Sequence, residues 1–408
     1  MYLHFSDLYT KANSPPISLD SLAPANSDAT GLAGIRELSA RRSQSVGREC
    51  CKFKPSDNTI EKHVRIFEKY LSLLQQFIHA ANTKGWRLEI TPPSSGFCWS
   101  SPLSSLPSSS QASLPHVLLE FTMALCFYAA ALQENAWRLL QNGITTGDGN
   151  RGGGVATSED VRKSEEDSAS LTAAAILLRK SAGAYAHIRN TLLPEIETTG
   201  ALPLIKNIPF LPLELDATSV EALEIMAIAQ AQGVAAERAE RKNASHTAIA
   251  AVNRGAVDLY EAAAAKLKLI SQPATPPPSE RFRMWLALSA ELHAIKALRA
   301  QAGICRQDGE LGQAVACLKD AIIRIQRCLT VVSTAKEESA GWRMPFIFEL
   351  RNVESIHAVY DKERVVVYVQ GIASVVPPPP PGKVVIAPAS VEWLESSSAA
   401  GITDHYFI

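Results

Sequence analysis

The residue types that support catalysis or metal binding are scattered through this 408-residue chain. Its nine histidines include no H-x-x-x-H or H-E-x-x-H pair, the spacing that places two imidazoles on one helix face to bind zinc. No G-x-S-x-G sequence is present to set a nucleophilic serine on a strand-to-helix turn. We therefore interpret the histidines as ordinary surface or core residues.

Two local patterns come nearest to a chemical site. The run Gly147–Gly154 resembles a phosphate-binding loop, but it lacks the closing Lys with Ser or Thr, and no predicted strand precedes it. The carboxylates of Glu195 and Glu197 lie beside Pro194 at a predicted helix end, where we expect them to be solvated. The sequence thus predicts that the protein is not an enzyme and binds no cofactor or metal. A deep pocket with strongly perturbed titratable groups would argue for an enzyme instead.

Composition narrows the class of protein further. The formal net charge of −1 argues against a nucleic-acid binder, which would carry a basic excess or stripe. The longest apolar stretch, Phe121–Leu132, falls short of the roughly 18 residues of a membrane span, so we predict a buried helix and no transmembrane segment. The N-terminus lacks the features of a signal peptide. Seven cysteines without a C-x-x-C pair favour free thiols in a reducing compartment, so we expect a cytoplasmic protein.

Apolar residues recur at helical spacing through most of the chain. The first such helix has an apolar stripe at spacings of three and four, formed by Ile60, Val64, Phe67, Leu71, Leu74 and Ile78. Further helices are predicted over 114–141, 169–192, 217–242, 244–270, 280–306 and 310–335. The last two are joined at Gly309 and share the small-residue spacing of a tetratricopeptide hairpin, in which close helix approach requires Gly or Ala.

The segments between and beyond these helices lack that periodicity. We expect an irregular N-terminal arm over 1–55 with one short helix near 31–46, and a disordered tail over 386–408. A Ser-rich linker (100–113), a Gly-rich and acidic loop (142–168) and a Pro-rich break (271–279) interrupt the helical region. Short extended segments are predicted at 88–90 and 97–101, and β-branched and aromatic residues predict strands at 346–348, 357–360 and 365–369.

The helix predicted over 217–242 is central to the chain. Thr218 is placed to cap it, with Glu221 three residues later completing a capping box. Val220, Leu223 and Met226 form one apolar face, and small alanines between them permit neighbouring helices to approach closely. We therefore expect this helix to lie inside a stack of helices.

The same helix carries a family resemblance. Residues 225–232, Ile-Met-Ala-Ile-Ala-Gln-Ala-Gln, followed by Glu-Arg-Ala at 237–239, resemble the "MLAQAQE…KA" signature of the Bro-one domain. Phe97-Cys-Trp99 and the helix from Glu120 to Ala130 are similar to other elements of that family in the same order. The resemblance implies a mainly α, elongated, boomerang-like helical solenoid over 56–385, with a tetratricopeptide-like core and a few short β-strands. It also implies a final extended segment that returns along the body.

What the resemblance implies for function is an adaptor. Bro-one domains of the Alix type bind the amphipathic C-terminal helix of an ESCRT-III subunit in multivesicular-body sorting, so the protein is expected to associate peripherally with endosomes through this partner. The matching positions for a partner-helix groove are Leu202, Phe210, Leu213, Leu215, Val220 and Leu223, and the flanking charges are Lys206, Arg238 and Arg241. Two alternatives stay open: these apolar residues belong to the core, or the solenoid recruits an unrelated partner such as a receptor or a ubiquitin-linked factor.

Overall fold

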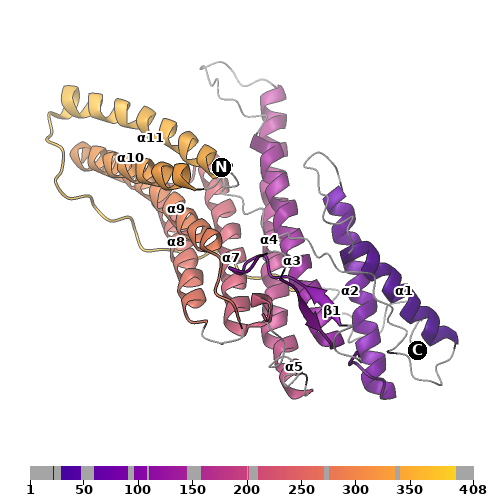
Figure 1. The fold of residues 1–408 in the computed structure, drawn as a ribbon. Helices are drawn as coiled ribbons and strands as arrows, with labels where there is room; N and C mark the ends of the chain where they lie inside the picture. The colour runs from indigo at the N-terminus through magenta and orange to yellow at the C-terminus, as the bar shows by residue number, and fades with distance from the viewer. Residues whose placement is uncertain are drawn as a thin grey trace.

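The structure is a computed structural model that describes residues 22, 29–46, 59–90, 96–107, 110–144, 158–199, 201, 210–270, 275–335 and 341–391. Within these residues the fold is mainly α, as the sequence predicts (Figure 1). The longer helices are α1 Ala29–Val46, α2 Thr59–Lys84, α3 Val117–Ile144, α4 Ser158–His187, α7 Ala217–Arg241, α8 His246–Lys268, α9 Glu280–Gln307, α10 Leu311–Thr334 and α11 Arg343–Glu363. Short elements are the strands β1 Phe97–Trp99 and β2 Ala112–Leu114, the helix α5 Leu193–Thr198, the 3-10 helix Leu213–Leu215, and π-helices at Ile188–Leu192 and Arg364–Tyr368.

The helices stand side by side in an elongated row, and most of them pack on their neighbours in sequence (Figure 1). Contacts run from α1 through α2, α3, α4 and α7 to α8, α9, α10 and α11. This serial packing confirms the predicted solenoid, because each helix buries its apolar stripe against the next one. The hairpin of α9 and α10 turns at Gly309, whose φ of +77° is readily adopted only by glycine.

A buried carboxylate ties the first helices together. Glu120 of α3, fully buried, accepts hydrogen bonds from Arg42 of α1 at 2.8 Å, Tyr70 of α2 at 2.7 Å and Trp99 of β1 at 2.5 Å. β1 pairs antiparallel with β2, with Phe97 opposite Leu114. The predicted Ser-rich linker is therefore a hairpin connection whose last residues form a strand.

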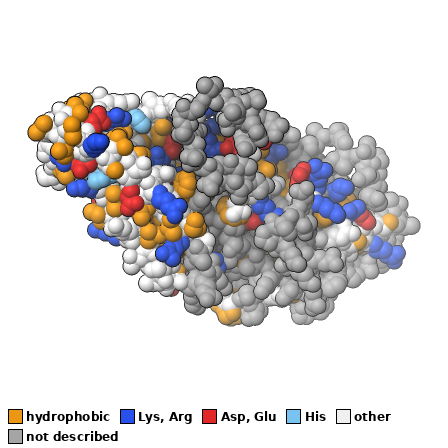
Figure 2. Space-filling view, turned by 90° about the horizontal axis from the view of Figure 1, so that it is seen from above, with side chains coloured by type: hydrophobic (Ala, Val, Ile, Leu, Met, Phe, Trp, Pro, Cys, Tyr) orange, Lys and Arg blue, Asp and Glu red, His pale blue; other side chains and the backbone are white. Residues whose placement is uncertain are grey.

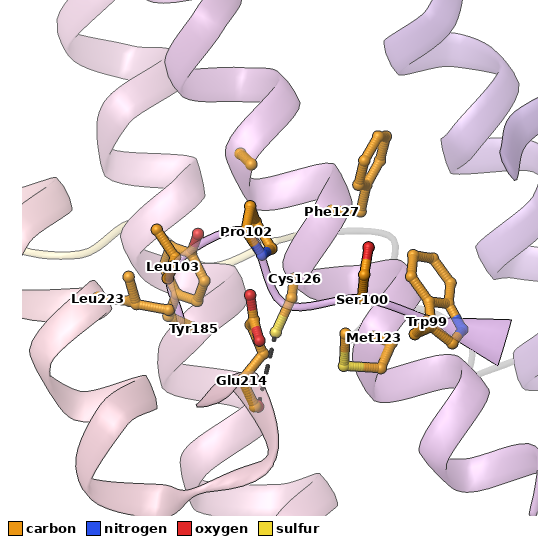
Figure 3. A pocket seen from close by; sticks show the side chains of 11 residues that line it. Trp99, Ser100, Pro102, Leu103, Met123, Cys126, Phe127, Tyr185, Glu214 and Leu223 are labelled. Atoms are coloured by element: carbon orange, nitrogen blue, oxygen red, sulfur yellow. Dashed lines mark hydrogen bonds between the residues drawn. The ribbon is translucent and has the colours of Figure 1, made fainter. Parts of the chain in front are cut away.

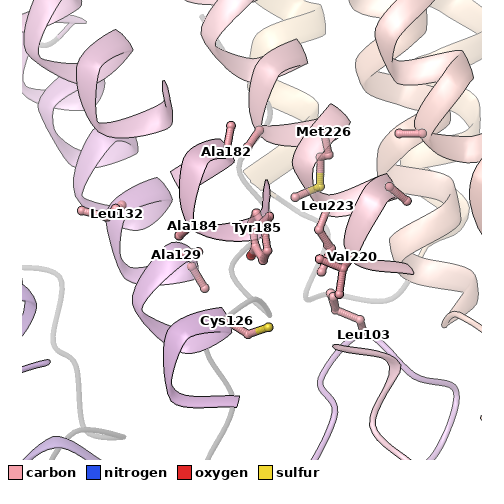
Figure 4. Close-up of a cluster of buried hydrophobic side chains, with 14 of the residues drawn as sticks. Leu103, Cys126, Ala129, Leu132, Ala182, Ala184, Tyr185, Val220, Leu223 and Met226 are labelled. Carbon is pink, nitrogen blue, oxygen red and sulfur yellow. The ribbon is translucent and has the colours of Figure 1, made fainter. Parts of the chain in front are cut away.

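Helix α7 is central, as expected, and lies between α4 and α8. Figure 4 shows Tyr185 of α4 between side chains of α3 and those of Val220, Leu223 and Met226 of α7. The predicted capping residue is wrong. Asp216, not Thr218, is the N-cap, because its carboxylate accepts from the backbone N–H of Ser219 at 2.8 Å and also from its hydroxyl.

The strands predicted after Met344 are wrong, because that region is helical. α11 buries Phe346, Glu349, Val353 and Tyr360, whose spacings of three, four and seven residues define one helix face against α10. Packing of this face overrides the β propensity of the intervening residues. The valines beyond it form the exposed π-helix Arg364–Tyr368. Figure 2 shows hydrophobic side chains at this end of the molecule, interspersed with charged ones.

Beyond α11 an extended segment, residues 369–391, returns along the body; we call it the C-terminal strap (Figure 1). Its backbone bonds to α10 (Ala373 N–H to Gly312 O, 3.1 Å), to α8 (Lys383 N–H to Ala251 O, 2.9 Å) and to α4 (Ala389 N–H to Arg179 O, 3.0 Å). The strap confirms the returning segment that the family resemblance implies. It also corrects the predicted tail, since residues 386–391 are extended along α4 and Val391 is buried. Residues 392–408 lie outside the described residues.

The helix predicted near 31–46 within the N-terminal arm is confirmed as α1, which has 18 residues and packs on α2. One other predicted boundary shifts. The last part of the predicted loop 142–168 is helical, because α4 begins at Ser158. One described segment, Val117–Gln141 of α3, is long and apolar enough to cross a membrane by length and composition, but 89% of its most apolar window is buried inside the protein. α3 is therefore packed as a core helix.

Candidate functional site

A small cavity beside a buried carboxyl lies between β1, α3, α4 and α7 (Figure 3). Its volume of about 30 Å³ has room for about one water molecule and none for a substrate. Glu214 lines it, and burial raises the pKa of this carboxyl to about 7. The Sγ of Cys126 donates to the Glu214 carbonyl oxygen at 3.9 Å. This cavity is an interior water-sized space beside a buried acid.

Metal binding finds no support in the described part of the chain. No group of three His, Cys, Asp or Glu side chains there is placed to hold an ion. The most buried histidine, His293, has Asn253 Oδ1 at 2.9 Å and stacks on Tyr260. Burial lowers the pKa of His293 to about 3, so its imidazole is neutral and serves as a core residue.

Four of the six predicted groove residues are core residues, which corrects that part of the prediction. Leu213, Leu215, Val220 and Leu223 are 7% exposed or less and belong to the main hydrophobic core. Figure 4 shows Val220 and Leu223 directed into the interior beside Tyr185, where a partner helix has no access. Phe210 is 53% exposed and sits at a positive φ of 66° just before that buried segment. Leu202 and Lys206 lie outside the described residues.

An open apolar groove does lie beside α7, on the face where α4 and the C-terminal strap meet it. This α4–α7 groove has a volume of about 500 Å³. It is lined by Leu171, Thr172, Ala175, Ile176, Arg179, Val234, Ala235, Arg238, Ala239, Lys242 and Ile386. Its size is in the range of ligand and peptide pockets.

The floor of the α4–α7 groove rests on a separate packed cluster. Leu171 and Val234 are buried in this cluster together with Ala136 and Leu140 of α3, and Ile386 of the strap packs against it. Ile176 projects from this floor with 47% of its surface exposed. The alanines at the groove are small, so a partner backbone can approach closely. The groove is rigid underneath and apolar at its surface.

The charged residues among those lining the groove are all basic: Arg179, Arg238 and Lys242. The guanidinium of Arg179 donates to the strap carbonyl of Ala387 at 2.9 Å, which fixes the strap at the groove edge. The predicted flanking residue Arg238 therefore does lie at an apolar groove. The other one, Arg241, pairs with Asp167 at 3.4 Å and Glu237 at 3.5 Å and does not line it.

The strap is held at this place by a glutamine of α7. Gln232 is fully buried, and its amide donates to Lys383 O at 2.6 Å and accepts from Val385 N–H at 3.0 Å. The Gln232 side chain thus donates one hydrogen bond to the strap backbone and accepts another, as a neighbouring β-strand would. In the sequence, Gln232 is a polar residue of the central helix and the last residue of the 225–232 run. Its role depends on the strap, which lies 151 residues away in the sequence.

The apolar lining residues Ile176 and Ile386 were not predicted. The outward face of α4 at Thr172, Ile176 and Arg179 has i, i+4, i+7 spacing, which is the signal that sequence reasoning had available. Ile386 carries no such signal, since it falls in a segment expected to be disordered.

The structure is a helical solenoid with an open apolar groove between α4 and α7. The family described as the BRO1-like domain matches residues 155–401, more than half of the chain. The protein belongs to the BRO1-like domain family.

Solved structures agree with this fold. The chain is similar to a structure of the ALIX BRO1 CHMP4C complex, with a TM-score of 0.56 and 17% identity over 92% of this chain and 89% of that one. A structure described as the basis for endosomal targeting by the Bro1 domain matches with a TM-score of 0.58 and 14% identity, over 97% and 95% of the two chains. ALIX in complex with a viral late-domain peptide matches with a TM-score of 0.60 and 15% identity, over 93% of this chain and 48% of that one. No curated protein matches the chain in sequence.

Proposed function

We propose that the protein is a non-enzymatic adaptor whose α4–α7 groove binds the amphipathic C-terminal helix of an ESCRT-III subunit. The observation that carries the proposal is the groove itself, with its apolar floor and its basic lining residues Arg179, Arg238 and Lys242. A likeness to ALIX BRO1 solved with CHMP4C supports the choice of partner.

The groove suits an amphipathic helix in two respects. Ile176, Ala235 and Ala239 offer apolar contact area to a stripe of side chains at i, i+3, i+4 and i+7. Basic residues at the groove favour acidic residues beside that stripe and increase the rate of encounter. Affinity then comes from a few apolar anchors, while the charges set the direction of the partner helix.

The place of action follows from the partner. An ESCRT-III subunit assembled on an endosome would recruit the protein from the cytoplasm as a peripheral component. The likeness to a Bro1 domain structure described in terms of endosomal targeting supports this part of the proposal.

The test is a titration of the full chain with a C-terminal ESCRT-III helix peptide, using Ile176→Asp as the groove variant. Ile176 is half-exposed at the groove, so the aspartate can be solvated without disturbing the core. We expect saturable binding by the wild type and a loss of at least about tenfold in affinity for Ile176→Asp.

Phe210→Asp is the matched control, because Phe210 is an exposed apolar residue that does not line the groove. It should leave affinity unchanged. Equal loss in both variants, or unchanged binding by Ile176→Asp, would place the partner elsewhere on the molecule. A folded wild type that does not bind the peptide would favour an unrelated partner, such as a receptor or a ubiquitin-linked factor.

A further inference from the structure

The C-terminal strap carries an uninterrupted run of five prolines, Pro377–Pro381, between its attachments to α10 and α8. Each proline fixes its own φ near −65°, and a residue before proline is driven to an extended ψ. The run is therefore a polyproline II helix, with about three residues per turn and about 3.1 Å rise per residue.

A helix with three residues per turn has three edges, and the strap presents them differently. Gly382, on the edge shared with Pro379, faces α8: a Cβ on it would lie 2.1 Å from Asp258 Oδ2 and 3.0 Å from the Gly255 N–H nitrogen. The edge of Pro378 and Pro381 is exposed. The remaining edge, Pro377 and Pro380, is half-buried and continues to the exposed side chain of Lys383.

One edge is therefore exposed, the next is half-buried, and the third lies against α8. Aromatic-lined grooves that bind polyproline helices contact one side of the helix, which comprises two of its edges. The outward residues read Pro378-x-x-Pro381-x-Lys383, in which two prolines occupy the groove and a cation follows two positions later. No ion pair among the described residues engages the Lys383 ammonium group, so it is available to an acidic partner.

The run is also fixed in place before any partner arrives. Ala373 is bonded to α10 and Lys383 to α8, so both ends of the eleven-residue span are held by backbone hydrogen bonds. Gln232 holds the peptide on the far side of Lys383 as well. A ligand segment that is already rigid loses little conformational entropy on binding.

We propose that Pro377–Lys383 is a second docking site, for a domain of the SH3 type with an aromatic groove and an acidic pocket. This site is distinct from the α4–α7 groove and uses residues that the groove does not. It gives the protein a way to join a proline-reading partner to the helix-bound complex.

The test is an NMR titration of a ¹⁵N-labelled SH3 domain that reads P-x-x-P-x-K peptides against the full chain. We expect saturable shifts of the aromatic-groove and acidic-pocket signals. Pro381→Ala and Lys383→Glu should each weaken binding by about tenfold.

Pro379→Ala is the matched control, because it removes one proline from the same run but on the edge that faces the protein. It should bind as the wild type does. Hydrogen exchange at the Lys383 amide reports whether the strap stays attached to α8 in each variant. Absence of wild-type binding, or equal weakening by Pro379→Ala and Pro381→Ala with the strap attached, would show that the run is only a rigid spacer and overturn the proposal.

Discussion

Two buried carboxylates, Glu120 and Glu214, differ in how far hydrogen bonds compensate for their burial. Glu120 is compensated by three donors, whereas the Oε2 of Glu214 has no hydrogen-bond partner in the described structure. Burial without full compensation destabilises the ionised form of Glu214. This raises the pKa of its carboxyl from 4.5 to about 7. The pKa of this carboxyl is higher in the folded state than in the unfolded state. Its burial is therefore tolerated best at low pH, where it is protonated in both states. The folded state loses stability as the pH rises above the pKa of the unfolded state.

The free energy of unfolding should therefore fall as the pH rises from about 4.5 to about 7, by on the order of 3 kcal/mol from Glu214 alone. Glu214→Gln keeps the shape without the charge and should remove this part of the pH dependence. Urea unfolding at pH 5 and pH 8 measures it, with the exposed Glu197→Gln as the control. The same pH dependence in wild type and Glu214→Gln would refute the assignment.

Among the elements, the C-terminal strap depends on glycines in the helices beneath it. Gly183 of α4, Gly255 of α8 and Gly312 of α10 each lie where a Cβ would collide with a strap carbonyl, at 1.8, 2.6 and 2.2 Å. A helical glycine normally costs about 1 kcal/mol relative to alanine. At these three glycines the strap backbone approaches too closely to leave room for a side chain. The glycines therefore determine where the strap can lie.

Gly183→Ala should detach the end of the strap from α4. Overpacking costs about 1–3 kcal/mol, which outweighs the gain of about 1 kcal/mol in helix propensity. We expect faster hydrogen exchange at the Ala389 amide, which bonds to Arg179 O. Gly341→Ala, where a Cβ meets nothing within 4 Å, should leave that exchange unchanged. An unaltered Ala389 amide in Gly183→Ala would mean that α4 yields instead.

The whole molecule is nearly neutral, so its electrostatic character depends on where charges gather. Interior ion pairs hold the helices in register: Arg299 of α9 bonds Glu349 of α11 at 2.6 Å and Glu240 of α7 at 2.9 Å. The α4–α7 groove differs, because its charged lining residues are cations without an acidic residue among them. A net charge of −1 therefore conceals a local cluster of cations at this groove.

Arg238→Glu should slow association with an acidic ESCRT-III peptide and reduce the salt dependence of the rate constant. Stopped-flow fluorescence at several salt concentrations measures both. Arg351→Glu makes the same change of charge at an exposed position on α11, away from the groove, and should leave the rate nearly unchanged. Similar rate losses in both variants would indicate a response to net charge alone.

Local sequence patterns suffice for most of the helices. Helical spacing of residues is a local property of the sequence, and the ranges predicted for α7, α9 and α10 agree closely with those found. The pattern fails at α11, where valines and aromatics favour strands in isolation. There the outcome depends on Phe346 and Val353 meeting α10, a contact that no local pattern contains.

The α4–α7 groove also divides between local and tertiary information. The sequence alone was enough to indicate the helical class, the family signature on α7 and one basic residue, Arg238, that lines the groove. The sequence did not show whether Val220 and Leu223 lie in the core or on an exposed apolar face, because the same residue types occur in both. Only the tertiary structure placed Ile386 beside Ile176 and aimed one edge of the proline run at α8. Those juxtapositions join segments far apart in the chain, and they arise when helices and strap pack together.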